Sequence, residues 1–145
     1  YYAGKSFSGL ILKEKLMLPK GKIKSLAEKY SLAIFTGRPA NEAEFALNRF
    51  GIRGHFSEIV TENDVPHNKG KPDPFGISLI KKRFTSRNYI YFGDTTADIM
   101  AANRAKISSV AILPKNNPDS VKKLFIGAGA GKILRNIGEI HKVVK

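Results

Sequence analysis

Short apolar runs alternate with amphipathic stretches along this chain, and this alternation constrains its fold more than any other feature of the sequence. A short apolar run that stops at Gly or Pro is typical of a buried strand, whereas apolar residues at i, i+3, i+4 and i+7 are typical of a helix with one buried face. The predicted strands cover residues 32–35, 56–61, 89–92 and 108–113. The predicted helices cover residues 21–30 and 43–50, the stretch after Asp73, and residues 97–105, 119–125 and 132–143.

The residues between these segments support the same division. Gly51 is suited to end the second helix, and Asp73 with Pro74 is suited to begin the third. The stretch 62–74 is polar and contains three prolines, so we expect a loop there. Strands separated by helices predict parallel βαβ units with right-handed crossovers, and the expected fold class is therefore α/β. A chain of 145 residues can bury one core but not two independent ones.

The net charge raises the question of a polyanionic partner. The chain has 25 Lys and Arg against 12 Asp and Glu, which gives a formal net charge of +13. This excess is typical either of a surface that binds nucleic acid or of the solvated helix faces of a basic protein. No aromatic residues are interleaved with the lysines and no nucleic-acid motif is present. We therefore favour solvated faces and expect no nucleic-acid partner.

Cysteine and apolar content limit the remaining classes. The sequence contains no cysteine, which excludes disulfides, cysteine metal ligands and cysteine nucleophiles, and which suits a cytoplasmic location. No apolar run approaches the ~20 residues of a membrane span, so we expect no membrane partner.

Polar clusters lie at or near three predicted strand ends. Thr36-Gly37-Arg38 follows the first strand, Lys71 lies in the long loop, and Asp94 and Asp98 follow the third strand. Ligands of parallel sheets bind beyond the carboxyl ends of the strands, so these clusters can converge in space. A hydroxyl, a lysine and two carboxylates are the groups that phosphoryl transfer uses to bind phosphate oxygens, neutralise their charge and hold Mg²⁺.

Each of these residues also has a purely structural interpretation. Thr36-Gly37 is compatible with a simple turn, Lys71 with a solvated loop lysine, and Asp98 with a carboxylate that stabilises the start of a helix. The functional interpretation is favoured because all of them occur together, in this order and at three strand ends.

The same residues resemble the motifs of the haloacid dehalogenase-like hydrolases, in particular the phosphoglycolate-phosphatase-like members that carry a helical cap. Residues 34–39 (IFTGRP) are similar to the second family motif, 70–74 (GKPDP) to the third and 91–98 (YFGDTTAD) to the fourth. The resemblance covers about residues 16–143. It implies a Rossmann-like parallel sheet with flanking helices, in which residues 1–15 end the cap and residues 16–145 form an incomplete core.

The resemblance also implies roles for the site residues. Thr36 and Gly37 would bind the transferring phosphoryl group, and Lys71 would stabilise both that group and the nucleophile. Asp94 and Asp98 would form the metal site, with Asp98 supporting either the metal or the lysine. The implied cofactor is Mg²⁺, and the implied partner is a small phosphorylated metabolite.

One family motif does not occur in the sequence. It is Asp-x-Asp, whose first aspartate attacks phosphorus to form an aspartyl-phosphate and whose second acts as acid and base. None of the five aspartates lies two residues from another; they are residues 64, 73, 94, 98 and 119. We therefore expect a fragment that lacks the first, central strand and most of the cap and that is inactive alone. The missing N-terminal segment, or a partner strand in trans, would complete its sheet.

Two other features compete with this interpretation. Residues 127–132 (GAGAGK) resemble a nucleotide-binding glycine loop but are one residue short, and Ile133 stands where a Ser or Thr would contact Mg²⁺, so we expect a mobile turn. Lys69 is an alternative to Lys71, but it lacks the following Pro-x-Pro. The three histidines show no spacing typical of metal ligands.

The sequence thus predicts a Mg²⁺-dependent phosphatase that hydrolyses a small phosphomonoester when the protein is complete. Halide displacement is disfavoured, because Asp94 and Asp98 are similar to metal ligands and dehalogenation needs no metal. The alternative from another class is a non-catalytic module of the same fold that binds an acidic partner or nucleic acid. Such binding would weaken steeply with salt.

Overall fold

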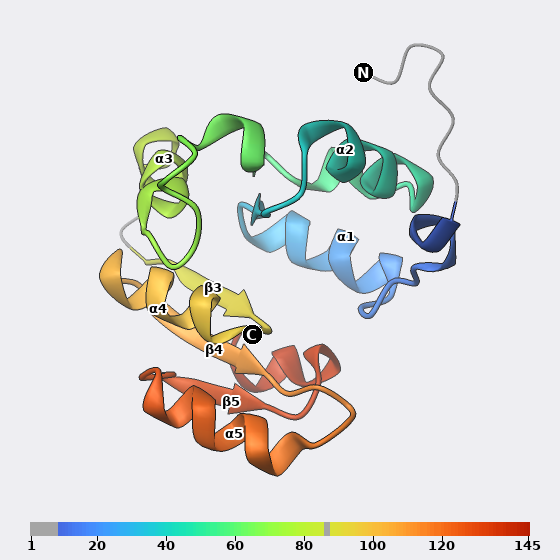
Figure 1. The fold of residues 1–145 in the computed structure, drawn as a ribbon. Coiled ribbons are helices and arrows are strands. Elements are labelled where there is room, and N and C mark those ends of the chain that lie inside the picture. Colours follow the sequence, from blue (N-terminus) through green and yellow to red (C-terminus); the bar gives the residue numbers. More distant parts are fainter. Residues whose placement is uncertain (1–8, 86–87) are drawn as a thin grey trace. The chain divides into compact units, whose positions relative to one another are not determined.

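A computed structural model describes residues 9–85 and 88–145 of the chain (Figure 1). The chain divides into two compact units, Tyr1–Asp64 and Val65–Lys145. The predicted α/β fold is confirmed, because helices separate the strands along the chain and every strand pair among the described residues is parallel.

In the first unit, the described residues form two α-helices, three short 3-10 helices and a two-stranded sheet. Its elements are η1 (Gly9–Lys13), α1 (Lys20–Lys29), β1 (Ala33–Phe35), α2 (Ala40–Arg49), η2 (Arg53–His55), β2 (Glu58–Val60) and η3 (Glu62–Asp64), where η marks a 3-10 helix. The buried core joins Ile23 of α1, Leu47 of α2 and Ile52. Gly51 follows α2 with a φ of +66°, which is the left-handed conformation expected for a glycine that ends a helix.

The predicted end of the cap lies at the start of this unit. Residues 1–8 of that segment lie outside the described residues, and η1 occupies the part that follows them. The assignment of residues 1–15 to a cap stays a prediction.

The second unit contains a three-stranded sheet in the order β3-β4-β5. Its elements are α3 (Phe75–Arg83), β3 (Ile90–Gly93), α4 (Thr96–Arg104), β4 (Ser108–Ile112), α5 (Pro118–Gly127), β5 (Lys132–Leu134) and η4 (Ile137–Lys142). The register places Gly93 of β3 opposite Ala111 of β4. Pro74 precedes α3, and the Asp73 carboxylate accepts from the Phe75 N–H at 2.8 Å, so the helix begins close to where the sequence predicts.

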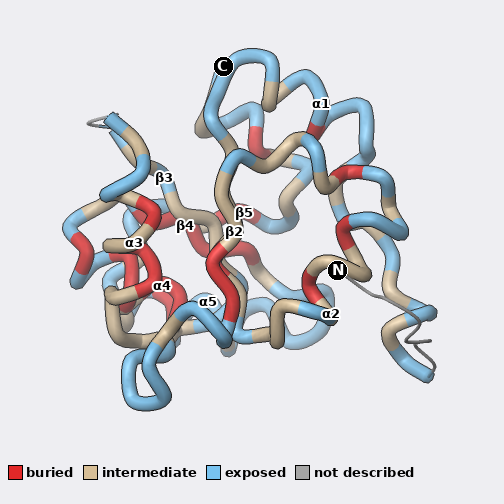
Figure 2. Tube along the Cα trace, turned by 90° about the horizontal axis from the view of Figure 1, so that it is seen from above, coloured by how far each residue is buried: buried red, intermediate tan, exposed pale blue. Residues whose placement is uncertain are grey.

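Both faces of this sheet are covered. Ala111 packs with Ile99 of α4 and Phe125 of α5 on one side. Its neighbours in β4, Val110 and Ile112, pack with Leu134 and with side chains of η4 on the other. β4 is buried along residues 109–112, of which Val110, Ala111 and Ile112 are apolar, as expected for a strand that is covered on both faces (Figure 2).

The predicted last helix over 132–143 is wrong. Residues 132–134 form β5, which pairs with β4, and a 3-10 helix follows. Ile133 and Leu134 pack into clusters on opposite faces of the sheet, which is the period of a strand. The spacing of Ile133, Ile137 and Ile140 matches the period of a helix, which is why the sequence predicts one. In the structure, residues 132–134 form a strand because they pair with β4.

Within the glycine-rich segment 127–132, residues 128–131 form a turn between α5 and β5, and this turn precedes a strand where the sequence predicts a helix. Gly129 adopts a φ of +84°. Asn103 donates from Nδ2 to the carbonyl oxygens of Ala128, at 3.1 Å, and Gly129, at 2.9 Å. The Ser109 hydroxyl accepts from the Gly131 N–H at 3.2 Å. These contacts give the glycines a structural role in joining α5 to the sheet.

Candidate active site

The centre of the site in the second unit is an ion pair between Lys71 and Asp98. Lys71 lies in the loop before α3, and Asp98 lies in the first turn of α4. The Lys71 Nζ donates to Asp98 Oδ1 at 2.6 Å, and the Asp98 side chain is only 4% exposed against 21% for Lys71. A nearly buried carboxylate therefore fixes the position of the lysine.

The start of α4 explains why Asp98 points inward. Thr95 is the N-cap, and its hydroxyl accepts from the Asp98 N–H at 3.2 Å. In return Asp98 Oδ2 accepts from the Thr95 N–H at 3.1 Å and from the Thr95 hydroxyl at 2.8 Å. This reciprocal capping box satisfies donors at the helix start and orients the carboxylate.

Gly93 makes room for this arrangement. A Cβ atom on Gly93 would lie 2.3 Å from the Cβ of Asp98, well inside the closest approach of two carbon atoms. A glycine at the end of β3 is thus a packing requirement of the Asp98 carboxylate.

Tyr91 completes the surroundings of Asp98. Its hydroxyl, from β3, donates to Asp98 Oδ1 at 3.1 Å. Burial alone would raise the pKa of Asp98, but the hydrogen bonds from Lys71, Thr95 and Tyr91 outweigh it and hold the pKa below its ordinary value. Burial, followed by the charge of Asp98, raises the pKa of Tyr91, so the phenol stays a neutral donor.

Asp94 differs from Asp98 in its exposure and in its contacts. It is exposed at the end of β3, and within residues 9–85 and 88–145 its side chain makes no hydrogen bond or ion pair. An accessible carboxylate of this kind fits Mg²⁺, which binds through one or two carboxylates and retains waters. In the described part of the chain, no three His, Cys, Asp or Glu residues gather into a fuller metal site.

The predicted metal role of Asp98 stays a prediction, and its contacts match its other predicted role. Both of its oxygens already accept hydrogen bonds, two from Thr95 and one each from Lys71 and Tyr91. Lys69, the alternative lysine, instead lies 3.5 Å from Asp73 with its side chain largely in solvent.

Thr36 and Gly37 belong to the first unit, at the end of β1. The Thr36 N–H donates to the carbonyl of Val60 at 2.9 Å, and its hydroxyl accepts from the Arg38 N–H at 3.2 Å. Gly37 is exposed, with open space where a Cβ would lie. Their convergence with Lys71 stays a prediction.

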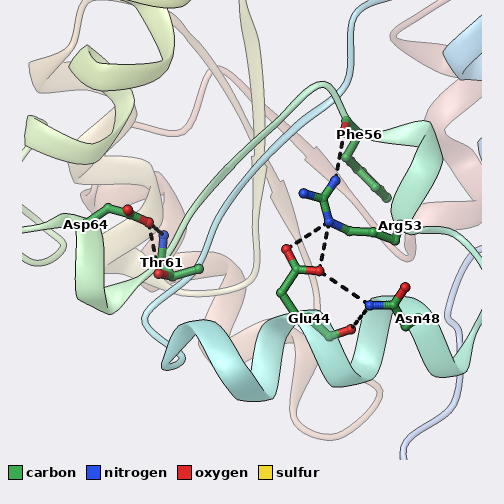
Figure 3. A network of polar contacts seen from close by, with 6 residues as sticks. All are labelled: Glu44, Asn48, Arg53, Phe56, Thr61 and Asp64. Carbon is green, nitrogen blue, oxygen red and sulfur yellow. Dashed lines mark hydrogen bonds and ion pairs between the residues drawn. The ribbon is translucent and has the colours of Figure 1, made fainter. Parts of the chain in front are cut away.

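Two hydrogen-bonded groups lie on either side of β2 in the first unit, one before the strand and one after it (Figure 3). Arg53 Nε donates to both carboxylate oxygens of Glu44, each at 2.9 Å. After β2, Asp64 Oδ2 accepts from the N–H of buried Thr61 at 2.8 Å and from its hydroxyl at 2.9 Å. These contacts stabilise the fold around β2.

The sequence analysis missed three partners of the site residues. Thr95 could have been found, because Thr-x-x-Asp is a capping-box pattern. Tyr91 carries no such signal, because an aromatic residue in a strand is most simply a packing residue. The pairing of Arg38 with Glu14, 24 residues away, also has no local signal.

The fold and site define the class of protein, an α/β protein whose polar residues follow the strands of a parallel sheet. The model of one family, described as "Haloacid dehalogenase-like hydrolase", matches residues 20–112, which is more than half of the chain. The chain therefore belongs to the haloacid dehalogenase-like hydrolases.

The chain is also similar to individual proteins. The chain is 31% identical over 112 residues to a phosphoglycolate phosphatase of Haemophilus influenzae, covering 70% of this chain and 50% of the relative. It is 28% identical over 135 residues to an imidazoleglycerol-phosphate dehydratase of Phytophthora nicotianae, covering 90% of this chain and 29% of that protein. A solved structure of a predicted phosphoglycolate phosphatase from Haemophilus somnus superposes with a TM-score of 0.68 at 26% identity, covering 87% of this chain and 55% of that one.

The chain thus spans about half the length of the phosphoglycolate phosphatase that it matches. Among the described residues, no helix combines the length and the apolar character that crossing a membrane requires.

Proposed function

We propose that the complete protein hydrolyses a small phosphomonoester through an aspartyl-phosphate, with Mg²⁺ held at Asp94. The observation that carries this proposal is the 2.6 Å contact between Lys71 and Asp98. Asp98 lies in α4, the helix that begins just after exposed Asp94. The similarity to a phosphoglycolate phosphatase supports a phosphomonoester as substrate.

Lys71 supplies a fixed positive charge for the phosphoryl oxygens. An ammonium group neutralises phosphate charge without demanding a particular orientation. Asp98 holds this group in place, so little reorganisation is needed when charge develops in the transition state. Thr36 contributes its hydroxyl, and Gly37 its backbone N–H, as neutral donors to the same group.

Asp94 is the residue that would hold the metal directly, and Asp98 supports the site through Lys71. When bound, Mg²⁺ would supply further neutralisation of charge on the phosphoryl oxygens. Asp94 suits this role because it is exposed and carries the oxygen ligands that Mg²⁺ prefers.

The nucleophile and the acid/base are not among these 145 residues, since no two aspartates form Asp-x-Asp. In this proposal they come from a further N-terminal segment or from a partner strand in trans, and the chain as given is inactive alone. Each sheet ends on a strand that precedes a site loop: β1 pairs with β2, and β3 pairs with β4. An edge strand can bind an added strand. The absence of cysteine suits a cytoplasmic location, which is part of the proposal.

The test is Mg²⁺-dependent hydrolysis of 2-phosphoglycolate and p-nitrophenyl phosphate by the protein that contains an Asp-x-Asp segment. We expect Lys71→Met and Asp94→Asn each to reduce kcat/KM at least 100-fold, which corresponds to roughly 2.7 kcal/mol of transition-state stabilisation. Lys69→Met is the matched control in the same loop and should retain activity. Unchanged turnover in either site variant would contradict the assignment. Salt-sensitive binding of oligonucleotides without hydrolysis would favour the binding-module alternative.

A further inference from the structure

A second ion pair follows β1 in the first unit, outside the roles assigned above. Arg38 donates from Nη1 to Glu14 Oε2 at 3.0 Å and from Nη2 to Glu14 Oε1. This two-point geometry is the one by which a guanidinium recognises a carboxylate. Within the described ranges, the two side chains form hydrogen bonds only with each other.

The backbone on both sides of this pair is held independently of it. The Arg38 N–H donates to the Thr36 hydroxyl at 3.2 Å, and the Arg38 carbonyl accepts from the Glu62 N–H at 3.0 Å. Arg49 donates to the carbonyl of Glu14 at 3.1 Å and to that of Leu12 at 2.6 Å. The carboxylate and the guanidinium can therefore separate while both loops stay in place.

The pair is also weak enough to exchange its partners. The side chains of Arg38 and Glu14 are 42% and 33% exposed, and ion pairs at such positions contribute about 0–1 kcal/mol. The neighbouring Arg53–Glu44 pair is similarly exposed, at 39% and 25%, but it belongs to a larger network. There Arg53 also donates to the Phe56 carbonyl and Glu44 also accepts from Asn48 (Figure 3).

We propose that Arg38 binds a carboxylate of the substrate, and that Glu14 occupies the guanidinium when no substrate is present. This inference rests on the proposed function, in which Thr36, hydrogen-bonded to the Arg38 N–H, binds the phosphoryl group. It names the substrate class as a short phosphorylated carboxylic acid, whose carboxylate lies within an arginine's length of its phosphate. Binding exchanges hydrogen-bond partners and releases the Glu14 carboxylate to water, with no covalent change.

Two ligands that differ in one group test this inference on the protein that contains an Asp-x-Asp segment, which is the protein used in the activity assay above. Phosphonoacetate carries a phosphonate and a carboxylate, whereas methylphosphonate lacks the carboxylate. Their dissociation constants, measured by calorimetry with Mg²⁺ present, are compared in the wild type, Glu14→Gln, Arg38→Gln and Glu44→Gln. The last variant is the matched control, because it disrupts the other arginine–glutamate pair of the same unit. Thermal unfolding of each variant checks that it is folded.

We expect Glu14→Gln to bind phosphonoacetate about 3–5-fold more tightly, because the competing carboxylate has been removed. Its affinity for methylphosphonate should not change. Arg38→Gln should lose the preference for phosphonoacetate, and Glu44→Gln should behave as the wild type does.

Three results would overturn the inference: unchanged or weaker phosphonoacetate binding in Glu14→Gln, a preference that survives in Arg38→Gln, or an equal gain in Glu44→Gln. If Glu14→Gln is folded but binds phosphonoacetate more weakly, Glu14 supports the loop that carries Arg38 and does not compete with the ligand. If methylphosphonate binds without any preference for the carboxylate, only this inference fails. If neither ligand binds to any variant, the phosphate site of the proposed function fails as well.

Discussion

The two ion pairs that follow β3 and β1 have similar chemistry and opposite surroundings. Asp98 is almost completely buried, and its oxygens accept hydrogen bonds from three different residues. Glu14 is one-third exposed, and its carboxylate has Arg38 as its partner among the described residues. The comparison teaches that burial and the number of donors decide whether an ion pair is a fixed part of the fold or an exchangeable contact.

The physical reason is the cost of removing charge from water. A buried carboxylate is stable only if its oxygens are satisfied, so losing one partner leaves a large desolvation cost uncompensated. An exposed carboxylate loses little, because water replaces the partner. The second unit therefore uses its pair to fix a lysine, whereas the first unit has a pair that a ligand can open.

The largest effect is expected when two glycines are compared, one beside each ion pair. Gly93→Ala places a Cβ 2.3 Å from that of Asp98, and we expect a loss of about 3 kcal/mol in the free energy of unfolding. Gly37→Ala places its Cβ in open space and should change stability by less than about 0.5 kcal/mol. Urea denaturation of both variants measures the difference. Equal effects would show that the first turn of α4 is not fixed in the way described.

The next test removes one acid from each pair. Asp98→Asn leaves Lys71 facing a neutral amide in a largely buried position, and we expect a loss of about 2–3 kcal/mol, reduced because Lys71 retains some exposure. Glu14→Gln should cost no more than about 1 kcal/mol. Chemical denaturation at neutral pH measures both values. A Glu14→Gln loss as large as that of Asp98→Asn would contradict the exchangeable character of the first pair.

The same contrast explains what the sequence could predict. Lys71, Asp94 and Asp98 could be proposed as candidates because each lies in a short motif, and the glycine of one motif, Gly93, has a local packing cause in its contact with Asp98. The alternation of helix and strand predicted the α/β class because the pattern of apolar residues in each segment is also a local feature of the sequence. β5 could not be identified, because its three residues become a strand only by pairing with β4. The contrast between exposed Asp94 and buried, hydrogen-bonded Asp98 was also beyond the sequence, since it depends on how the chain packs around Asp98 and on the contact with Tyr91.

The smallest expected effect concerns Tyr91 and depends on pH. Tyr91→Phe keeps the ring but removes the donor to Asp98, and we expect a loss of about 1 kcal/mol at pH 7. The pKa of Asp98 is lowered on folding from its ordinary 3.8, so its charged form stabilises the fold above that pH, and this stability is lost as the pH falls below it. Because the phenol stabilises the charged carboxylate, the difference between Tyr91→Phe and the wild type should shrink as Asp98 becomes protonated.

Tyr89→Phe is the matched control for this pH dependence. The Tyr89 hydroxyl lies 3.3 Å from the carbonyl oxygen of Phe84 and 3.4 Å from that of Lys81, and neither acceptor titrates. Its loss should therefore not change with pH, whereas that of Tyr91→Phe should decrease as the pH falls below 3.8 and Asp98 becomes protonated. Denaturation curves for both variants above and below this pH separate the two cases. Parallel behaviour of the two tyrosines would mean that the phenol of Tyr91 does not act on the charge of Asp98, and the fixed pair would then depend on Lys71 and Thr95 alone.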